Sequence, residues 1–287
     1  MEQPTQTAKA NPISALKIAL RFLTRLPVHL TDEEDTVENR RLSTVFYPTV
    51  GLIIALILWA LSWIFYHAGL IYFAGGCLLL AVWVGLTGGL HLDGFMDVID
   101  AFLYPGTKEK RLEIMKDVHH GTFATVALVL LLIAKYMFAQ QALPMFPLFQ
   151  PQYLLAPILA RFIALRLVQS QPVINPNGMA AALKKELHPK AVRINGIIIL
   201  VLFLAIEIFM FYHKTHFMGF AKREIASRVF LVGAFFLRGV VYWKLPDWIG
   251  AWAKRAVGGI NGDVLGFAIE ITEVAVLFLA ELQFMYG

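Results

Sequence analysis

Three aspartates occur at helical spacing immediately after a long apolar run. Asp93, Asp97 and Asp100 are separated by four and then three positions, which places them on one face of an α-helix, with neighbouring Cβ atoms roughly 5 to 6 Å apart. Carboxylates held this close repel one another, and a hard divalent cation with oxygen ligands would relieve the repulsion. A solvated acidic helix end is the ordinary explanation in a soluble protein, but acids at the rim of an apolar span favour a functional site. The spacing therefore predicts a Mg²⁺ site.

A second polar segment precedes the next apolar run. Lys116, Asp117, His119 and His120 crowd its start. They are either a polar cap at the membrane surface or part of a catalytic site, and the spacing leaves both interpretations open. Neighbouring histidines and carboxylates are also zinc ligands, but the absence of a thiol and of His-Glu-x-x-His spacing in this segment argues against zinc.

A third polar segment comes late in the chain and is rich in glycine. Gly258, Gly259 and Gly262 let a backbone approach a phosphate closely at the start of a helix, where free N–H groups point outward. Asp263 and Glu270 follow and are nearly two helical turns apart, so they share a helix face. This segment is predicted to form the second half of a nucleotide or metal site.

The composition indicates which elements position these residues. The 287 residues are 58% hydrophobic and 16% charged, with a mean hydropathy of +0.65, whereas soluble domains carry about a quarter charged residues. The single cysteine, Cys77, excludes an internal disulfide and a cysteine-based metal site. We expect an all-α, polytopic membrane bundle with a segment at 1–44 and one transmembrane domain at 45–287. Runs of about 20 apolar residues predict seven spans, with six or eight as alternatives: 45–66, 70–92, 121–142, 153–169, 194–212, 229–248 and 264–283.

The positive charges predict the orientation of these spans. Seventeen Lys and Arg residues fall in alternate loops on one side and four on the other, and cytoplasmic loops retain the positive charge. The N-terminus and the functional loops are therefore expected in the cytoplasm, with the protein in the inner membrane. The scattered charges do not form a nucleic-acid-binding stripe. Residues 13–28 read as an amphipathic helix that lies among lipid headgroups, or that holds a substrate phosphate.

The motifs together resemble a known family. Gly-Gly-x-His-Leu-Asp-Gly-x-x-Asp-x-x-Asp, Ile-Met-Lys-Asp-x-x-x-Gly-Thr-Phe and Gly-Gly-x-x-Gly-Asp-x-Leu-Gly-x-x-x-Glu occur in this order, after Phe-Leu-Thr-Arg-Leu-Pro near the N-terminus. The pattern is similar to cobalamin synthase, also called adenosylcobinamide-GDP ribazoletransferase, over residues 12–282. His119 stands where that family commonly has Arg.

The resemblance implies a reaction and roles for the residues. The reaction is a Mg²⁺-dependent transfer from adenosylcobinamide-GDP to α-ribazole or its 5′-phosphate, with release of GMP. The first three aspartates and Asp263 would hold Mg²⁺, and one of the three, first of all Asp100, or His91 would accept the proton. Lys116, Arg25 and Arg161 would neutralise phosphate oxygens, with a buried structural partner as the equal alternative for Arg161. Asp117 would support catalysis, and Asp263 with Glu270 would complete the metal or guanine site. Whether the chain acts as a monomer or a homo-oligomer stays open.

Two other functions are considered. A CDP-alcohol phosphotransferase-like lipid enzyme uses similar chemistry, but its pattern requires an Arg where Ala101 and Phe102 follow Asp100. An ion-coupled transporter would use acids near the bilayer midplane, and Lys135 and Glu207 lie inside predicted spans. These two residues are more simply expected to pair with each other, and the clustering of acids at one rim favours an enzyme.

Overall fold

The computed structural model describes residues 10–70, 73–117, 119–141, 151–217 and 225–281, and these residues form helices connected by short loops. Nothing in the described ranges forms an extended sheet, and the one β-bridge joins Val173 to Ile260. The all-α prediction is therefore confirmed. The helices are α1 (Pro12–Leu23), α2 (Val37–Ser43), η1 (Thr44–Phe46), α3 (Tyr47–His67), α4 (Phe73–Thr87), α5 (Leu90–Leu103), α6 (Lys108–Ile114), α7 (Thr122–Gln141), η2 (Pro151–Leu154), α8 (Leu155–Ser170), α9 (Met179–Glu186), α10 (Ala191–Phe217), α11 (Ile225–Val257) and α12 (Gly262–Glu281).

Each of the seven apolar runs is largely helical, but fewer helices than seven have the length and composition of a span. Among the described residues, the continuous stretch Val37–His67 and the stretch Ala191–Tyr212 are long and apolar enough to cross a membrane. The pair α4 and α5 would count as a third span, but it bends by 87° at its break. The fold is thus that of a helical membrane protein with two or three candidate spans.

Helix α8 lies at the centre of the bundle. Nearly all its side chains are buried, and α3, α10, α11 and α12 pack around it. The approach of α3 is close because Gly51 faces the backbone of Pro157, where a Cβ atom would collide with the carbonyl group. The run at 153–169 is therefore apolar because protein surrounds it on most sides.

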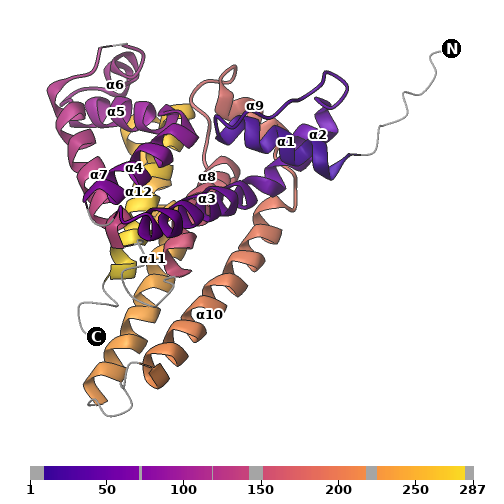
Figure 1. Ribbon diagram of the computed structural model, residues 1–287. Coiled ribbons are helices and arrows are strands. Elements are labelled where there is room, and N and C mark those ends of the chain that lie inside the picture. Colours follow the sequence, from indigo (N-terminus) through magenta and orange to yellow (C-terminus); the bar gives the residue numbers. More distant parts are fainter. Residues whose placement is uncertain (1–9, 71–72, 118, 142–150, 218–224, 282–287) are drawn as a thin grey trace.

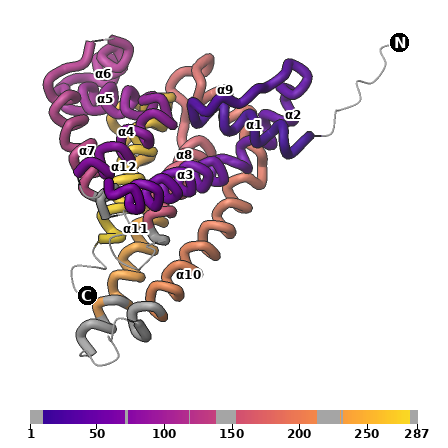
Figure 2. The backbone as a smooth tube through the Cα atoms, viewed as in Figure 1, coloured from indigo at the N-terminus to yellow at the C-terminus, as the bar shows by residue number. Residues whose placement is uncertain are grey.

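The polar elements gather at one end of the molecule. Figure 1 shows α5 and α6 on one side of this end and α1, α2 and α9 on the other, while α10 and α11 extend away from it as a long arm. The tube view in Figure 2 follows the same arrangement. Two contacts support it: Arg40 pairs with Glu186 at 2.7 Å, and Arg111 donates to the carbonyl of Ala256 at 3.4 Å. Segments predicted to share one side of the membrane thus lie together.

The expected amphipathic helix is α1, and protein covers part of its apolar surface, while Ile13 and Phe22 are exposed. Asn11 caps the helix by accepting from the Ile13 N–H at 2.9 Å, and Ala15, Ala19 and Leu23 are buried against the core. The opposite face carries Lys17, which pairs with Glu34 at 2.6 Å. The apolar positions of α1 therefore attach it to the bundle.

Candidate active site

A sharp bend between α4 and α5 places the first acidic segment. Gly88 and Gly89 both have left-handed backbone angles, with φ of 65° and 71°. Such angles favour glycine, because glycine has no Cβ atom to clash with the backbone. The side chain of Arg25 packs on Gly88, and the backbone N–H of Arg25 donates to the Leu86 carbonyl at 2.7 Å. The predicted span at 70–92 therefore ends at this bend, and α5 runs across the end of the bundle with its aspartates.

His120 faces two of the three aspartates. Its Nε2 lies 3.5 Å from Asp93 Oδ1, and its Nδ1 lies 3.5 Å from Asp97 Oδ1. The side chain of Asp93 is 62% exposed and that of Asp97 is 14% exposed. The sequence left His120 open between a polar cap and part of a catalytic site, because nothing in its spacing links it to a helix more than 15 residues earlier. The polar cluster around it, with Lys116, Asp117 and His119, was the available signal.

Asp97 also faces the start of α12. Burial, with the neighbouring charges of Asp263 and Asp93, raises the pKa of Asp97 to about 7, and burial also raises the pKa of Asp263. Asp263 lies outside the candidate spans, and Asp97 lies beyond the 87° bend of the α4–α5 pair. The close approach depends on Gly94, where a Cβ would lie 2.8 Å from the Asp263 Cα. The structure thus brings together carboxylates that are 166 positions apart in the sequence.

Asp100 has a different environment. Its Oδ2 accepts the Gly121 N–H at 2.5 Å, and its Oδ1 accepts the Ala124 N–H at 3.1 Å. Both carboxylate oxygens therefore bind backbone groups at the start of α7. The helical spacing of the three aspartates is as predicted, but Asp100 is engaged with the next helix while the other two face His120.

The remaining residues of the second motif lie on the surface. Asp117 accepts from the His119 N–H at 3.0 Å and lies 2.8 Å from His119 Nδ1, and these hydrogen bonds lower the pKa of Asp117. Lys116 is exposed. Lys116 is therefore accessible to a phosphate group, whereas Asp117 is negatively charged and already bound to its neighbour.

The glycine-rich segment is used for contacts within the protein. Ile260 exchanges backbone hydrogen bonds with the segment from Pro172 to Ile174, both at 2.9 Å, and Gly259 allows this because a Cβ there would collide with Pro172. Asn261 caps α12 by accepting from the Val264 N–H at 3.0 Å. Gly258 has φ of 92° and Gly262 faces Met179. The glycines therefore position Asp263 by shaping the turn.

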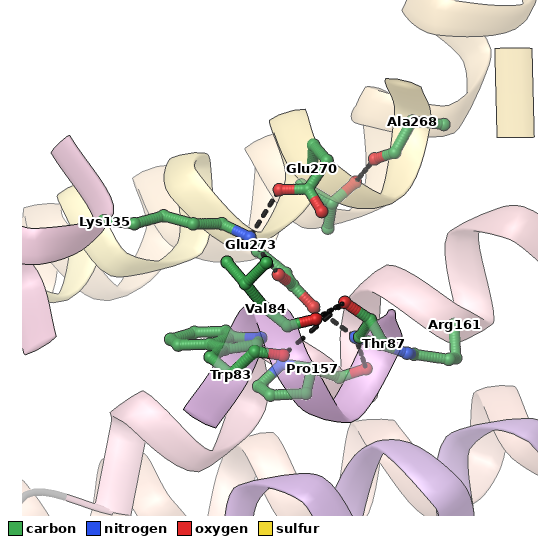
Figure 3. A network of polar contacts seen from close by, with 10 residues as sticks. Trp83, Val84, Thr87, Lys135, Pro157, Arg161, Ala268, Glu270 and Glu273 are labelled. Atoms are coloured by element: carbon green, nitrogen blue, oxygen red, sulfur yellow. Dashed lines mark hydrogen bonds and ion pairs between the residues drawn. The ribbon is translucent and has the colours of Figure 1, made fainter. Parts of the chain in front are cut away.

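Arg161 and Glu270 lie deeper, in a buried network of charges. Figure 3 shows Lys135 pointing at Glu270 and Glu273, and Arg161 approaching Glu273 from α8. The Lys135 ammonium lies 2.6 Å from Glu273 and 4.9 Å from the centre of the Trp83 ring. All four charged side chains are at most 3% exposed. The structure therefore places Arg161 and Glu270 in a structural network between α7, α8 and α12.

The expected pairing of Lys135 with Glu207 is wrong. Glu207 of α10 instead pairs with Arg238 of α11, where Arg238 Nε donates to Glu207 Oε1 at 2.7 Å. Lys135 faces α12, as described above. Hydropathy marked both residues as buried charges but gave no information on which helices touch.

A small cavity adjoins the acids. It has a volume of about 70 Å³ and lies between α1, α5, α9 and α12, with Asp93, Asp263 and the buried His91 in its wall. The rest of the lining is mostly apolar and includes Phe22, Tyr47 and Met179. His91 Nδ1 is buried and has no hydrogen-bond partner among the described residues. An apolar group of a substrate could enter here beside the carboxylates.

The acids suit a hard cation chemically, although they are not a preformed cage. Among the described residues, no group of three or more His, Cys, Asp or Glu side chains is arranged to hold a metal ion. However, Asp93, Asp97 and Asp263 supply oxygen ligands, which Mg²⁺ prefers, and their mutual repulsion contributes to the raised pKa of Asp97. A cation between them would remove this repulsion.

Comparison with known proteins identifies the family of this chain. The family model for cobalamin-5-phosphate synthase matches residues 15–281, which is most of the chain. The chain belongs to the cobalamin-5-phosphate synthase family. Its relatives include three enzymes named adenosylcobinamide-GDP ribazoletransferase, and no solved structure matches the chain.

These relatives match this family member along nearly its whole length. The enzyme of Stutzerimonas stutzeri is 34% identical over 93% of this chain and 98% of its own. The enzyme of Acinetobacter baumannii is 33% identical over 94% and 97%, and that of Pseudomonas fluorescens is 35% identical over 91% and 96%. The family model, over residues 15–281, covers most of α1 as well as the acidic segments and α12.

Proposed function

We propose that this chain is an adenosylcobinamide-GDP ribazoletransferase, which catalyses one of the last steps of cobalamin biosynthesis. The observation that carries the proposal is the family match over residues 15–281, in a fold where Asp97 faces Asp93 and Asp263. The acceptor is α-ribazole or its 5′-phosphate. The acceptor's ribose hydroxyl attacks the phosphorus attached to cobinamide, the bond from that phosphorus to GMP breaks, and GMP leaves.

We assign the metal-binding role to the acids on either side of Asp97. Asp93 and Asp263 would hold Mg²⁺, which when bound neutralises charge on the diphosphate, the main requirement of phosphoryl transfer. Asp97 is our candidate for the proton acceptor, because its side chain is only 14% exposed and this burial raises its pKa towards the working pH, where a general base works best. The attacking hydroxyl gives its proton to this carboxylate.

Cations and apolar surface around the acids suit the two substrates. Arg25, which packs on the α4–α5 bend, and the exposed Lys116 are candidates to bind phosphate oxygens, as charge-assisted hydrogen bonds are strong. The apolar cavity beside Asp93 and Asp263 is a candidate site for an apolar part of either substrate. We place the protein in the inner membrane, with α1, α5 and α9 on the cytoplasmic side, where soluble nucleotides reach the site.

The test is GMP release by the purified protein in liposomes. Adenosylcobinamide-GDP and α-ribazole phosphate are supplied with Mg²⁺ or with EDTA, and GMP and the corrinoid product are measured together. We expect Mg²⁺-dependent release of both products in equal amounts. Asp97→Asn should lower the rate by about 10² to 10⁴-fold, the usual contribution of a general base.

A matched control separates this loss from a general effect of charge. Glu33→Gln also removes one carboxylate, but Glu33 is exposed on the loop after α1, so its rate should be unchanged. Normal turnover by Asp97→Asn would exclude that residue from the mechanism. A folded, Mg²⁺-supplied protein that releases no GMP but consumes CDP-linked lipids, or that moves ions, would overturn the proposed function.

A further inference from the structure

We propose that Asp100 is a positioning residue, which fixes the turn before α7 so that His120 lies over Asp93 and Asp97. This inference rests on the proposed function and concerns the architecture of the same site. It gives the three aspartates of one helix face two different tasks. Asp93 and Asp97 face the reacting groups, and Asp100 holds the segment that closes over them.

Asp100 forms hydrogen bonds with two backbone N–H groups at the start of α7. One carboxylate oxygen accepts from Gly121 at 2.5 Å and the other accepts from Ala124 at 3.1 Å. The first N–H groups of a helix have no partner within the helix, and an acidic side chain near them is favourable. Asp100 therefore caps α7 from a neighbouring helix and ties α7 to α5.

Gly121 lies directly against Asp100, so a larger residue at this position would displace the Asp100 carboxylate. A Cβ atom at this position would lie 2.8 Å from Asp100 Oδ1 and 3.2 Å from Oδ2. The Gly121 carbonyl also accepts from the N–H and the hydroxyl of Thr125, both at 3.1 Å. The glycine thus holds the first turn of α7 directly against the carboxylate.

His120 is held in place because it is joined directly to Gly121 in the chain. His120 precedes Gly121, and its two ring nitrogens each lie 3.5 Å from a carboxylate, one on Asp93 and the other on Asp97. Asp100 binds the backbone N–H of Gly121, the residue that follows His120. His120 therefore has little freedom to move away from the two acids. The clamp formed by Asp100 and Gly121 therefore sets how closely the turn approaches the two acids.

A double-mutant cycle tests the clamp, with GMP release as one measurement. Gly121→Ala and Asp100→Ala should each lower the rate at least about tenfold. In the double variant the carboxylate that collides with the new Cβ is gone, so its rate should be within about threefold of Asp100→Ala alone, since contacting residues show non-additive effects. Gly85→Ala is the control, because a Cβ at Gly85 meets nothing within 4 Å, and it should retain full activity.

A conservative variant separates positioning from direct participation. Asp100→Asn keeps one acceptor oxygen for the α7 backbone, so it should retain at least about ten times the rate of Asp97→Asn. A metal ligand or proton acceptor at position 100 would instead make the two variants equally inactive, and that result would overturn the proposal. Rates in the double variant that equal the product of the two single losses would overturn it as well.

Amide hydrogen exchange tests the clamp without any turnover. Asp100→Ala should accelerate exchange at residues 121–125, and Gly85→Ala should leave exchange there unchanged. Unchanged exchange in Asp100→Ala would refute the clamp even in an active enzyme. Conversely, faster exchange in Asp100→Ala, together with an unsubstituted protein that releases no GMP, would retain the clamp and refute the proposed function.

Discussion

Asp93 and Asp97 are one helical turn apart, but their surroundings give them different chemistry. The Asp93 side chain is 62% exposed and that of Asp97 is 14% exposed. Loss of water disfavours a charged carboxylate, and nearby negative charges add to this effect. A pKa of about 7 for Asp97 therefore follows from its position under α12, which no spacing within α5 could have predicted.

At the residue scale, we expect Mg²⁺ to stabilise the folded protein through these acids. A ligand that binds only the folded state at 100 times its dissociation constant adds about 2.7 kcal/mol of stability. Thermal unfolding with Mg²⁺ or EDTA, followed by tryptophan fluorescence, should show a higher Tm with Mg²⁺. Asp93→Asn should reduce this difference and Glu33→Gln should not. An equal Mg²⁺ effect in both variants would contradict binding at Asp93.

At the scale of elements, the crossing of α5 and α12 holds the site together. Their contact is the most extensive between any two helices in the described part of the chain. Gly94 and Gly266 lie at the crossing, where a Cβ on Gly266 would be 3.1 Å from the His91 carbonyl oxygen. Two small residues let the backbones meet, and this closeness places Asp263 opposite Asp97.

Gly94→Ala should therefore damage both packing and catalysis. The new Cβ would lie 2.8 to 2.9 Å from Asp263 backbone atoms, which cannot move without shifting α12. Overpacking of this kind costs about 1 to 3 kcal/mol, so both the Tm and the rate of GMP release should fall. Gly85→Ala, which adds the same methyl group in open space, is the control. A Gly94→Ala variant with normal Tm and rate would disprove the importance of the crossing.

At the scale of the whole molecule, the apolar runs predicted the helices but not their environment. Composition indicated an all-α membrane protein, and every predicted run contains a helix. However, α8 is apolar because other helices surround it, and hydropathy does not distinguish protein from lipid as a neighbour. The bend at Gly88 and the partners of Lys135 and Glu207 also depend on contacts between distant segments, so sequence spacing could not supply them.

The buried charge network connects α7, α8 and α12. Glu273 binds both Lys135 and Arg161, so Glu273→Gln leaves two buried cations with one carboxylate, Glu270. Breaking a buried ion pair by removing one partner costs about 3 to 5 kcal/mol, and we expect a large drop in Tm. The double variant Lys135→Met/Glu270→Gln keeps the pair of Arg161 and Glu273 and should lose less. The opposite order of stabilities would contradict this role of Glu273.

The pair of Glu207 and Arg238 has a consequence for how the protein enters the membrane. Glu207 lies in a stretch apolar enough to cross a bilayer, and its partner Arg238 follows 31 residues later in the chain. A charged residue at the centre of a lone inserted helix costs roughly 2.5 to 3.5 kcal/mol on insertion scales. The ion pair with Arg238 offsets such a cost, so we expect helix α10 to be held more firmly in the bilayer once α11 has been synthesised.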